Sequence, residues 1–213
     1  MTCALTASVA GLDVLLIEKT EYYGGTTALS GGVIWVPDNA LMVDGVGDSA
    51  EAAQRYLTHN VGNRVAPARL RAFVVQAPKM LELLRQNGFL AVATFDGFPD
   101  YRPEDPGAAA SGRSVEPKVF AGRHLGPALA RLRARSNLAP GGIVGTMTEL
   151  RHLAAIRSNP IELLKAWKVL PRNLWNRLTR ARHLAGGAGL IARLRYSMLK
   201  RNIPLWLNAA LDQ

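Results

Sequence analysis

The segment from Glu18 to Gly32 gathers residue types that could hold a nucleotide and a flat ring. Glu18 follows a short apolar run, and a carboxylate at the carboxyl end of a strand in an open α/β sheet can accept both hydroxyls of a ribose. The Gly24–Gly25 pair lets the backbone approach a ligand closely. Thr26–Thr27 and Ser30 supply hydroxyl groups, and Gly31–Gly32 leaves room for a flat ring. Each feature alone fits a solvated charge or an ordinary turn, so the prediction rests on their order.

The residues before this segment predict the start of an α/β domain. Residues 14–17 form an apolar run with the length of one buried parallel strand. Residues 1–10 are small and predict a helix that Gly11 ends. A dinucleotide-binding βαβ unit has a strand and a G-x-G-x-x-G turn before such a helix, and the sequence from Met1 contains neither. We therefore expect an incomplete domain, with Met1 in doubt as the true start.

The order of these residues closely resembles the FAD-binding segment of the flavoprotein superfamily that includes fumarate reductases and 3-ketosteroid dehydrogenases. The continuation VIWVPDN, residues 33–39, looks most like the 3-ketosteroid dehydrogenase branch. The resemblance implies an incomplete α/β FAD-binding domain of the glutathione-reductase type, which is Rossmann-like. It also implies that the adenosine ribose, the pyrophosphate and the flavin edge of FAD are held by Glu18, Lys19, Gly24, Gly25, Thr26, Thr27, Ser30, Gly31 and Gly32.

A second motif lies in residues 96–117, which predict a loop through their Gly, Pro and Asp content. By itself, Phe98-Pro99-Asp100-Tyr101 fits an ordinary surface loop with a packed aromatic ring. It also resembles the F-P-D-Y segment of 3-ketosteroid dehydrogenases. That resemblance implies that Tyr101 lines the steroid pocket and supports the catalytic tyrosine, and that Phe98 is an apolar wall of the pocket. The family's catalytic tyrosine belongs to a part of its chain beyond residue 213.

Scaffold elements are predicted between the two motifs. Asp48–Ser49 offers an N-cap for a helix, with Glu51 three residues after Asp48 as in a capping box. Pro67 begins a second helix, which Asn87–Gly88 ends. A short strand is expected over residues 89–95.

Positive charge is concentrated in the later part of the chain. The net charge is +10, and residues 121–213 hold 13 Arg and 3 Lys against 2 Glu and 1 Asp. We expect a basic helix over 125–136 and three helical pieces over 145–184, divided at residues 158–160 and at Pro171. Basic helices with Leu and Trp fit either a solvated surface or peripheral contact with an anionic membrane. No recognition motif accompanies the charge, so nucleic acid is not an expected partner.

The last elements are a helix and a strand. Gly186–Gly187 opens the helix, Asn202 can take a left-handed cap, and residues 203–207 predict a strand. The pattern resembles the return of the family's chain to the flavin sheet. We therefore divide the chain into a FAD-contacting core (1–47), helices with a substrate-side loop (48–120), a basic helical segment (121–185) and a return helix and strand (186–213).

The composition excludes several classes of protein. The chain is 48% hydrophobic and 20% charged, as in globular proteins, and no run approaches the roughly 18 apolar residues of a membrane span. Its single cysteine, Cys3, excludes an internal disulfide framework, and the four histidines lack the spacing of metal ligands. The N-terminus lacks the basic start of a signal peptide. These features favour a cytoplasmic protein, to which the basic segment would add peripheral association with a membrane.

Three functions remain open from the sequence. The resemblance favours the 1,2-dehydrogenation of a 3-ketosteroid, a lipophilic substrate, in which a tyrosinate removes a proton from C2 while FAD takes a hydride from C1. It also implies that this chain alone is inactive. One alternative is a fumarate reductase-like flavoprotein, which would need arginines to clamp a dicarboxylate. The other is a non-catalytic basic fragment that binds anionic membranes.

Overall fold

The computed structural model describes residues 1–42, 47–133, 143–156, 158–179 and 181–211. These residues form helices and short strands, as the predicted α/β class requires, and they group into two compact units. Unit 1 contains residues 1–32, 88–91 and 117–213, whereas unit 2 contains residues 33–87 and 92–116. In this described part of the chain, no helix is both long enough and apolar enough to cross a membrane.

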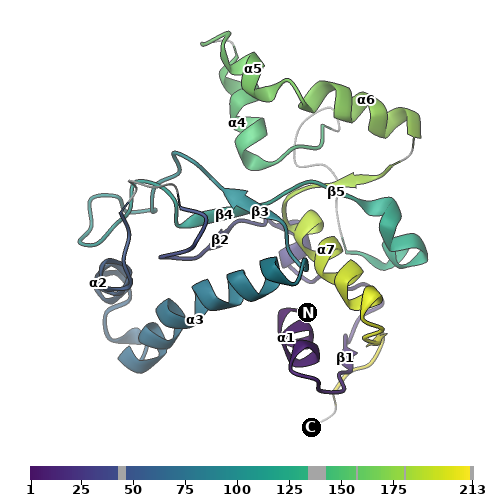
Figure 1. Ribbon diagram of the computed structural model, residues 1–213, viewed down its shortest axis with the longest axis horizontal. Coiled ribbons are helices and arrows are strands. Elements are labelled where there is room, and N and C mark those ends of the chain that lie inside the picture. The colour runs from purple at the N-terminus through teal and green to yellow at the C-terminus, as the bar shows by residue number, and fades with distance from the viewer. Residues whose placement is uncertain (43–46, 134–142, 157, 180, 212–213) are drawn as a thin grey trace. The chain divides into compact units, whose positions relative to one another are not determined.

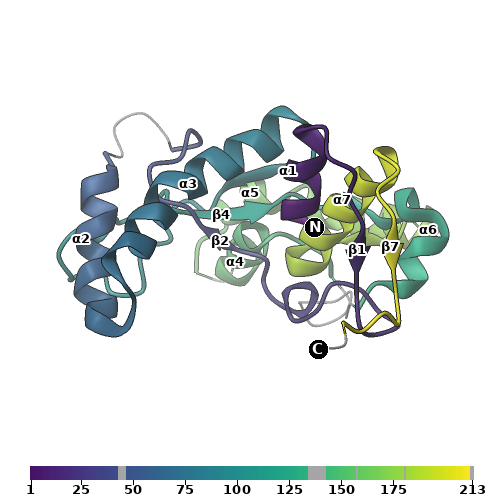
Figure 2. The same ribbon diagram turned by 90° about the horizontal axis from the view of Figure 1, so that it is seen from below.

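Unit 1 begins with the predicted helix and strand. Helix α1 (Thr2–Val9) leads into β1 (Leu16–Ile17), which pairs in parallel with β7 (Leu205–Trp206) in the register Leu16 to Leu205 (Figure 2). The parallel pairing confirms the predicted strand, but its burial was predicted wrongly, since Ile17 is 40% exposed. The described residues give β1 no strand neighbour other than β7, so one edge of β1 is unpaired.

Helix α7 (Gly186–Lys200) is the centre of unit 1, and it packs against α1 and the short helix η1 (Thr27–Leu29). Its buried face carries apolar residues at helical spacing, and Asn202 adopts the predicted left-handed conformation at φ +56°. The core of unit 1 comprises Tyr23, Ala28, Phe120, Leu125, Leu132, Leu184, Ala188, Ile191 and Ala192.

The basic segment contains three helices, as predicted: α4 (Met147–Ala155), α5 (Glu162–Ala166) and α6 (Val169–Thr179) (Figure 1). The predicted division at Pro171 is wrong, because this proline lies in the first turn of α6, where a missing N–H costs no helical hydrogen bond. The end of the segment is also not helical. Strand β6 (His183–Leu184) there pairs antiparallel with β5 (Phe120–Ala121).

The predicted basic helix over 125–136 takes a different form. Residues Gly122–Arg131 form the 3₁₀ segment η3, which is interrupted where Gly126 adopts φ +53° before Pro127. Residues 134–136 lie outside the described part of the chain. Glycine followed by proline breaks the regular turn, because proline restricts the residue before it.

Unit 2 consists of a small sheet with two helices. Strands β2 (Ile34–Trp35), β4 (Ser114–Pro117) and β3 (Val92–Thr94) are ordered β2-β4-β3, and the pairing of β2 with β4 is antiparallel. The prediction of a loop through residue 117 is therefore wrong at its end. Strand β4 is buried along its whole length, since it lies between the other two strands.

The helices of unit 2 are α2 (Ala50–Val61), followed by the short η2 (Gly62–Arg64), and α3 (Pro67–Gln86). The N-cap predicted at Asp48–Ser49 is confirmed at Ser49, whose side chain accepts a hydrogen bond from the Ala52 N–H. The predicted capping box at Asp48 is wrong, because the carboxylate of Asp48 binds Arg113 instead.

Candidate functional site

An open cleft of about 480 Å³ in unit 1 brings the predicted nucleotide-binding residues together. It lies at the amino end of α1, beside β1, the glycine turn and one face of α7. We call it the N-terminal cleft. Its lining comprises Met1, Thr2, Cys3, Leu16, Ile17, Glu18, Tyr23, Gly24, Gly25, Thr27, Leu190, Ile191, Leu194 and Leu205. Four predicted cofactor residues therefore share one surface, whereas the lining does not include Lys19, Thr26, Ser30, Gly31 and Gly32.

Glu18 is positioned by the parallel strand pair. Its N–H donates to the carbonyl of Trp206 at 2.8 Å, and its own carbonyl accepts from the N–H of Ala209 at 3.0 Å. The side-chain atom Oε1 accepts from the N–H and the hydroxyl of Thr20 at 2.9 and 3.1 Å. Oε2 accepts no hydrogen bond from any described residue, so it remains available to a ligand.

The glycine turn exposes its backbone to the cleft. Gly24 and Gly25 adopt φ +114° and +54°, which side chains disfavour. A Cβ added to Gly25 would meet no atom within 4 Å, so this residue faces open space. Among the described residues, nothing accepts a hydrogen bond from the N–H groups of Gly25 and Thr26. Together with the uncapped amino end of α1, these groups favour an anion at this end of the cleft.

The second glycine pair, Gly31–Gly32, lies against the start of α7. A Cβ on Gly32 would come within 2.5 Å of the Gly187 nitrogen, and a Cβ on Gly187 would come within 1.8 Å of the Thr27 carbonyl oxygen. The N–H of Gly187 also donates to the carbonyl of Ser30 at 2.9 Å. The sequence predicted room for a flat ring at both glycines. The space at Gly32 is instead filled by the backbone of α7, and Gly31 is the more open position, with Met147 Sδ 3.8 Å from a Cβ placed there.

Tyr23 is a residue of the cleft that the sequence analysis did not identify. Its ring is buried, and its hydroxyl donates to the carbonyl of Ala128 at 3.0 Å. Burial raises the pKa of Tyr23 to about 12, although Arg195 opposes the shift, so the phenol is neutral at ordinary pH. Its place directly before Gly24–Gly25 was a signal that could have identified it.

The predicted substrate-side residues lie on a loop of unit 2. The ring of Phe98 stacks on Phe95 with centroids 4.5 Å apart, and Tyr101 meets Phe98 edge-on at 6.3 Å. Tyr101 is 91% exposed, so its hydroxyl is open to solvent on the surface of this unit. Asp100, which lies between Phe98 and Tyr101 in the sequence, is buried.

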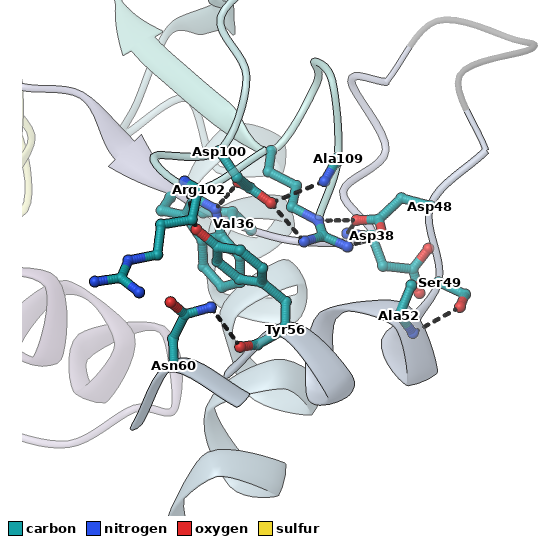
Figure 3. Close-up of polar contacts among 12 residues, drawn as sticks. Val36, Asp38, Asp48, Ser49, Ala52, Tyr56, Asn60, Asp100, Arg102 and Ala109 are labelled. Carbon is teal, nitrogen blue, oxygen red and sulfur yellow. Dashed lines mark hydrogen bonds and ion pairs between the residues drawn. The ribbon is translucent and has the colours of Figure 1, made fainter. Parts of the chain in front are cut away.

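A buried ionic cluster that includes Asp100 holds this loop in place (Figure 3). Asp100 accepts hydrogen bonds from Trp35 Nε1 at 2.7 Å, from the Ala109 N–H at 2.9 Å and from Arg113 at 2.7 Å. Arg113 also makes a two-pronged contact with Asp48 at 2.9 and 2.6 Å. Sequence analysis gave no role to Arg113, and no local signal connects it to Asp48, which lies 65 residues earlier.

The charges of Arg113 and Asp48 are stable at neutral pH. Burial alone would raise the pKa of Asp48, but hydrogen bonds from Arg113 and from the Asp38 N–H lower it below its ordinary value. The guanidinium of Arg113 further lies over the rings of Trp35 and Tyr56, at 5.5 and 5.8 Å from their centroids. The loop that carries Phe98 and Tyr101 is therefore attached to a rigid, ionised core.

Comparisons with known proteins agree with these motifs. The chain is 36% identical to the 3-oxosteroid 1-dehydrogenase of Mycobacterium tuberculosis (strain ATCC 25618 / H37Rv), over 99% of this chain and 38% of the relative. It is 37% identical to the 4-oxocyclohexanecarboxylate 2-dehydrogenase of Sinomonas cyclohexanicum, over 56% of this chain and 21% of the relative. The chain thus spans only about 38% of the length of the steroid dehydrogenase that it matches along almost its whole length.

A solved structure has the same fold. It is the 3-ketosteroid Δ1-dehydrogenase of Sterolibacterium denitrificans in complex with 1,4-androstadiene-3,17-dione, with a TM-score of 0.87 and 36% identity over 97% of this chain and 38% of that one. The family described as FAD binding domain matches residues 1–213, which is the whole chain. The chain therefore belongs to the FAD-binding domain family.

Proposed function

We propose that this chain is the FAD-binding part of a 3-ketosteroid 1,2-dehydrogenase. The observation that carries the proposal is the N-terminal cleft, where Glu18, Gly24–Gly25 and the amino end of α1 share one surface. The named relatives that match almost the whole chain support the steroid branch. The proposal includes the finer fold assignment, a glutathione-reductase-type domain, and the four-part division of the chain given above.

The residues of the cleft fit FAD. Glu18 keeps one carboxylate oxygen without a partner among the described residues, which suits the hydroxyls of the adenosine ribose, with Lys19 beside it. The free N–H groups of the turn suit the pyrophosphate, which Gly24, Gly25, Thr26 and Thr27 would hold. Ser30 and Gly31 would lie along the flavin edge, and Gly32 would hold the start of α7 next to it. When bound, FAD supplies the acceptor for a hydride from the steroid.

The loop of unit 2 would serve the substrate. Phe98 offers a flat apolar wall, which a steroid ring system needs. The hydroxyl of Tyr101 would donate a hydrogen bond that stabilises the negative charge of a catalytic tyrosine as a proton leaves C2 of the steroid. A fumarate reductase-like function has less support, because the relatives matched over almost the whole chain are 3-oxosteroid 1-dehydrogenases.

Anaerobic flavin reduction by a saturating 3-ketosteroid tests this function, in a full-length enzyme that contains this chain. Tyr101→Phe keeps the ring, so steroid affinity should change little, while the rate should fall by about 10- to 1000-fold, as for other donors that act in the transition state. Phe98→Ala should instead weaken steroid binding. Tyr22→Phe is the matched control, because Tyr22 is outside the cleft lining and outside the loop. A parent rate in the Tyr101 variant would remove Tyr101 from the site.

Peripheral contact with a membrane is a second function that one observation favours. Helices α5 and α6 present large apolar side chains to solvent, with Leu164 and Leu178 each 72% exposed. Among the residues of these helices and their flanks whose burial is described, the exposed large apolar ones are Ile161, Leu164, Trp167, Leu170, Leu174, Trp175 and Leu178. Lys165 and Lys168 lie among them in sequence, as in amphipathic segments that lie on anionic lipid. A lipophilic substrate would be delivered from such a surface.

Sedimentation with lipid vesicles tests this contact. The chain should bind anionic vesicles, and the binding should weaken as salt rises. Replacing Trp167 and Leu178 by serine should reduce the bound fraction, whereas Leu12→Ser, at another exposed leucine, should not. Equal partitioning onto neutral and anionic vesicles, or onto neither, would leave these helices as a solvated surface.

A further inference from the structure

We propose that a second cleft of unit 1 binds a phosphate group. This cleft has a volume of about 550 Å³ and lies between the β5–β6 pair and helices α4 and α6. We call it the basic cleft. It is lined by Lys118, Val119, Ala121, Thr146, Glu149, Lys168, Arg172 and His183, none of which lines the N-terminal cleft. The proposed phosphate site is therefore separate from the cleft proposed for FAD and from the loop proposed for the steroid.

The charges of the basic cleft do not balance. Arg172 donates two hydrogen bonds to Glu149, at 2.8 and 2.6 Å. Although burial alone would raise the pKa of Glu149, the bonds from Arg172 and the Thr146 N–H lower it, so this carboxylate is ionised and neutralises Arg172. Lys118 and Lys168 are then in excess. In the described structure the ammonium of Lys118 contacts no acceptor, and that of Lys168 lies 5.6 Å from the centre of the Trp167 ring.

The inner wall of the cleft holds two polar atoms that need a partner. His183 Nδ1 and Arg172 Nε are both buried, and neither makes a hydrogen bond to any described residue. Burial lowers the pKa of His183, as do the charges of Arg172 and Arg123, so its imidazole is neutral at pH 7 and one ring nitrogen can donate. Both atoms are closed to solvent, so an anion in the cleft would act on them through its charge and would be contacted directly by the lysines.

These donors are held in place before any ligand arrives. His183 belongs to β6, which pairs with β5, and its N–H donates to Asn176 at 2.8 Å. Arg172 is held by Glu149 and by the carbonyl of Val144, to which it donates at 2.9 Å. A preorganised wall lowers the entropic cost of binding.

The chemistry points to phosphate, because ammonium groups are effective point charges for it. A cleft of about 550 Å³ has room for more than a bare phosphate ion. The ligand could thus be a small phosphate monoester or the phosphate of a lipid headgroup, and the experiment below separates these two sources.

The first arm is calorimetric titration of the flavin-free chain with inorganic phosphate and with glycerol phosphate, at constant ionic strength. Both should bind saturably, and Lys118→Gln with Lys168→Gln should weaken binding by at least about tenfold through the loss of two charge-assisted contacts. Both lysines are exposed, so the double variant should keep its fold, which circular dichroism checks. Lys79→Gln with Lys200→Gln removes the same charge away from the basic cleft and should leave the affinity unchanged.

The second arm uses vesicles of phosphatidylglycerol or of phosphatidylcholine. If the soluble phosphates bind the chain, and the Lys118/Lys168 double variant binds them more weakly, the ligand is a free phosphate. Binding of phosphatidylglycerol vesicles alone, weakened by Lys118→Gln by itself and not by the control, identifies a lipid headgroup, because Lys118 lies outside the apolar helices α5 and α6. If neither kind of ligand responds to the double variant, the proposal is overturned. Neither arm contains flavin or steroid, so this result is independent of the proposed dehydrogenase function.

Discussion

Arg113 Nη1 lies 2.7 Å from Asp100 Oδ2, and both side chains are only 2% exposed. Asp100 directly precedes Tyr101, so this buried ion pair determines where the loop with the F-P-D-Y motif leaves the core of unit 2. A second buried carboxylate, Asp48, completes the coordination of the guanidinium. Removing one member of such a cluster leaves an uncompensated buried charge, which costs far more than losing a surface pair.

The first prediction concerns this cluster. Arg113→Met should lower the free energy of unfolding by about 3–5 kcal/mol, because Asp48 and Asp100 lose their counter-charge. Arg85→Met is the control. Arg85 pairs with Glu82 on the surface of α3, and such a pair is worth about 0.3–0.5 kcal/mol. Urea unfolding measures both changes, and equal midpoints for the two variants would show that the buried cluster adds nothing.

The second prediction concerns acid. The pKa values of Asp48 and Glu149 lie below their ordinary values of 3.8 and 4.5 in the folded chain. A depressed pKa stabilises the fold above the ordinary value, and that stability is lost as the pH falls through the folded value. The unfolding free energy should therefore be level above the ordinary values and fall below them. Asp48→Asn should flatten this dependence, whereas Asp13→Asn, at an exposed position, should not. The same slope in both variants would contradict the assignment to Asp48.

The third prediction concerns alkali. The pKa of Tyr23 is raised from 10.0 to about 12 by burial. A raised pKa gives stability that is complete below the ordinary value and is lost as the pH rises to the folded value. Stability should fall between these two values, together with the appearance of tyrosinate absorbance. Tyr23→Phe should remove the part of the absorbance change that occurs at the highest pH, and the control Tyr22→Phe should not. A Tyr23 that ionises at its ordinary pKa would show that its ring is not buried.

The fourth prediction tests the backbone contact between α7 and the glycine turn. Gly187→Ala places a Cβ 1.8 Å from the Thr27 carbonyl oxygen, so the turn must move. Overpacking of this kind costs about 1–3 kcal/mol, and FAD affinity should fall with it. Gly47→Ala is the matched control, since its Cβ would meet nothing within 4 Å. Thermal unfolding of both variants checks the effect, and a tolerated Gly187→Ala would mean that the helix does not approach so closely.

The sequence predicted elements whose signals are local. Glycine, proline and apolar spacing located α1, α7 and the cap at Asn202, because each depends on neighbours within a few residues. Glu18 was placed at the end of a strand for the same reason. The assignment of Glu18 and the glycine turn to one FAD site then followed from the resemblance to a known family.

What the sequence missed depends on distant partners. Strand β4 has no alternating burial pattern, since all 4 of its residues are buried in the centre of its sheet. Arg113 binds Asp48, which lies 65 residues earlier in the sequence. Because the carboxylate of Asp48 makes this contact, it does not cap helix α2 as predicted. His183 and Arg172 form the wall of the basic cleft only after β6 has paired with β5. No spacing within the sequence encodes these contacts.

The most direct test of the account is the dissociation constant of FAD for the Glu18→Gln chain relative to the parent chain, followed by flavin fluorescence. Glutamine keeps the size of Glu18 but removes the charge that would accept the ribose hydroxyls. The account predicts a loss of about 1–3 kcal/mol, the range for hydrogen bonds to a charged group. Glu21→Gln is the control, because Glu21 is an exposed carboxylate that pairs with Arg131 and does not line the cleft. Weaker binding in the Glu18 variant alone would support the N-terminal cleft as the FAD site. Equal dissociation constants for the parent and the Glu18 variant would contradict it.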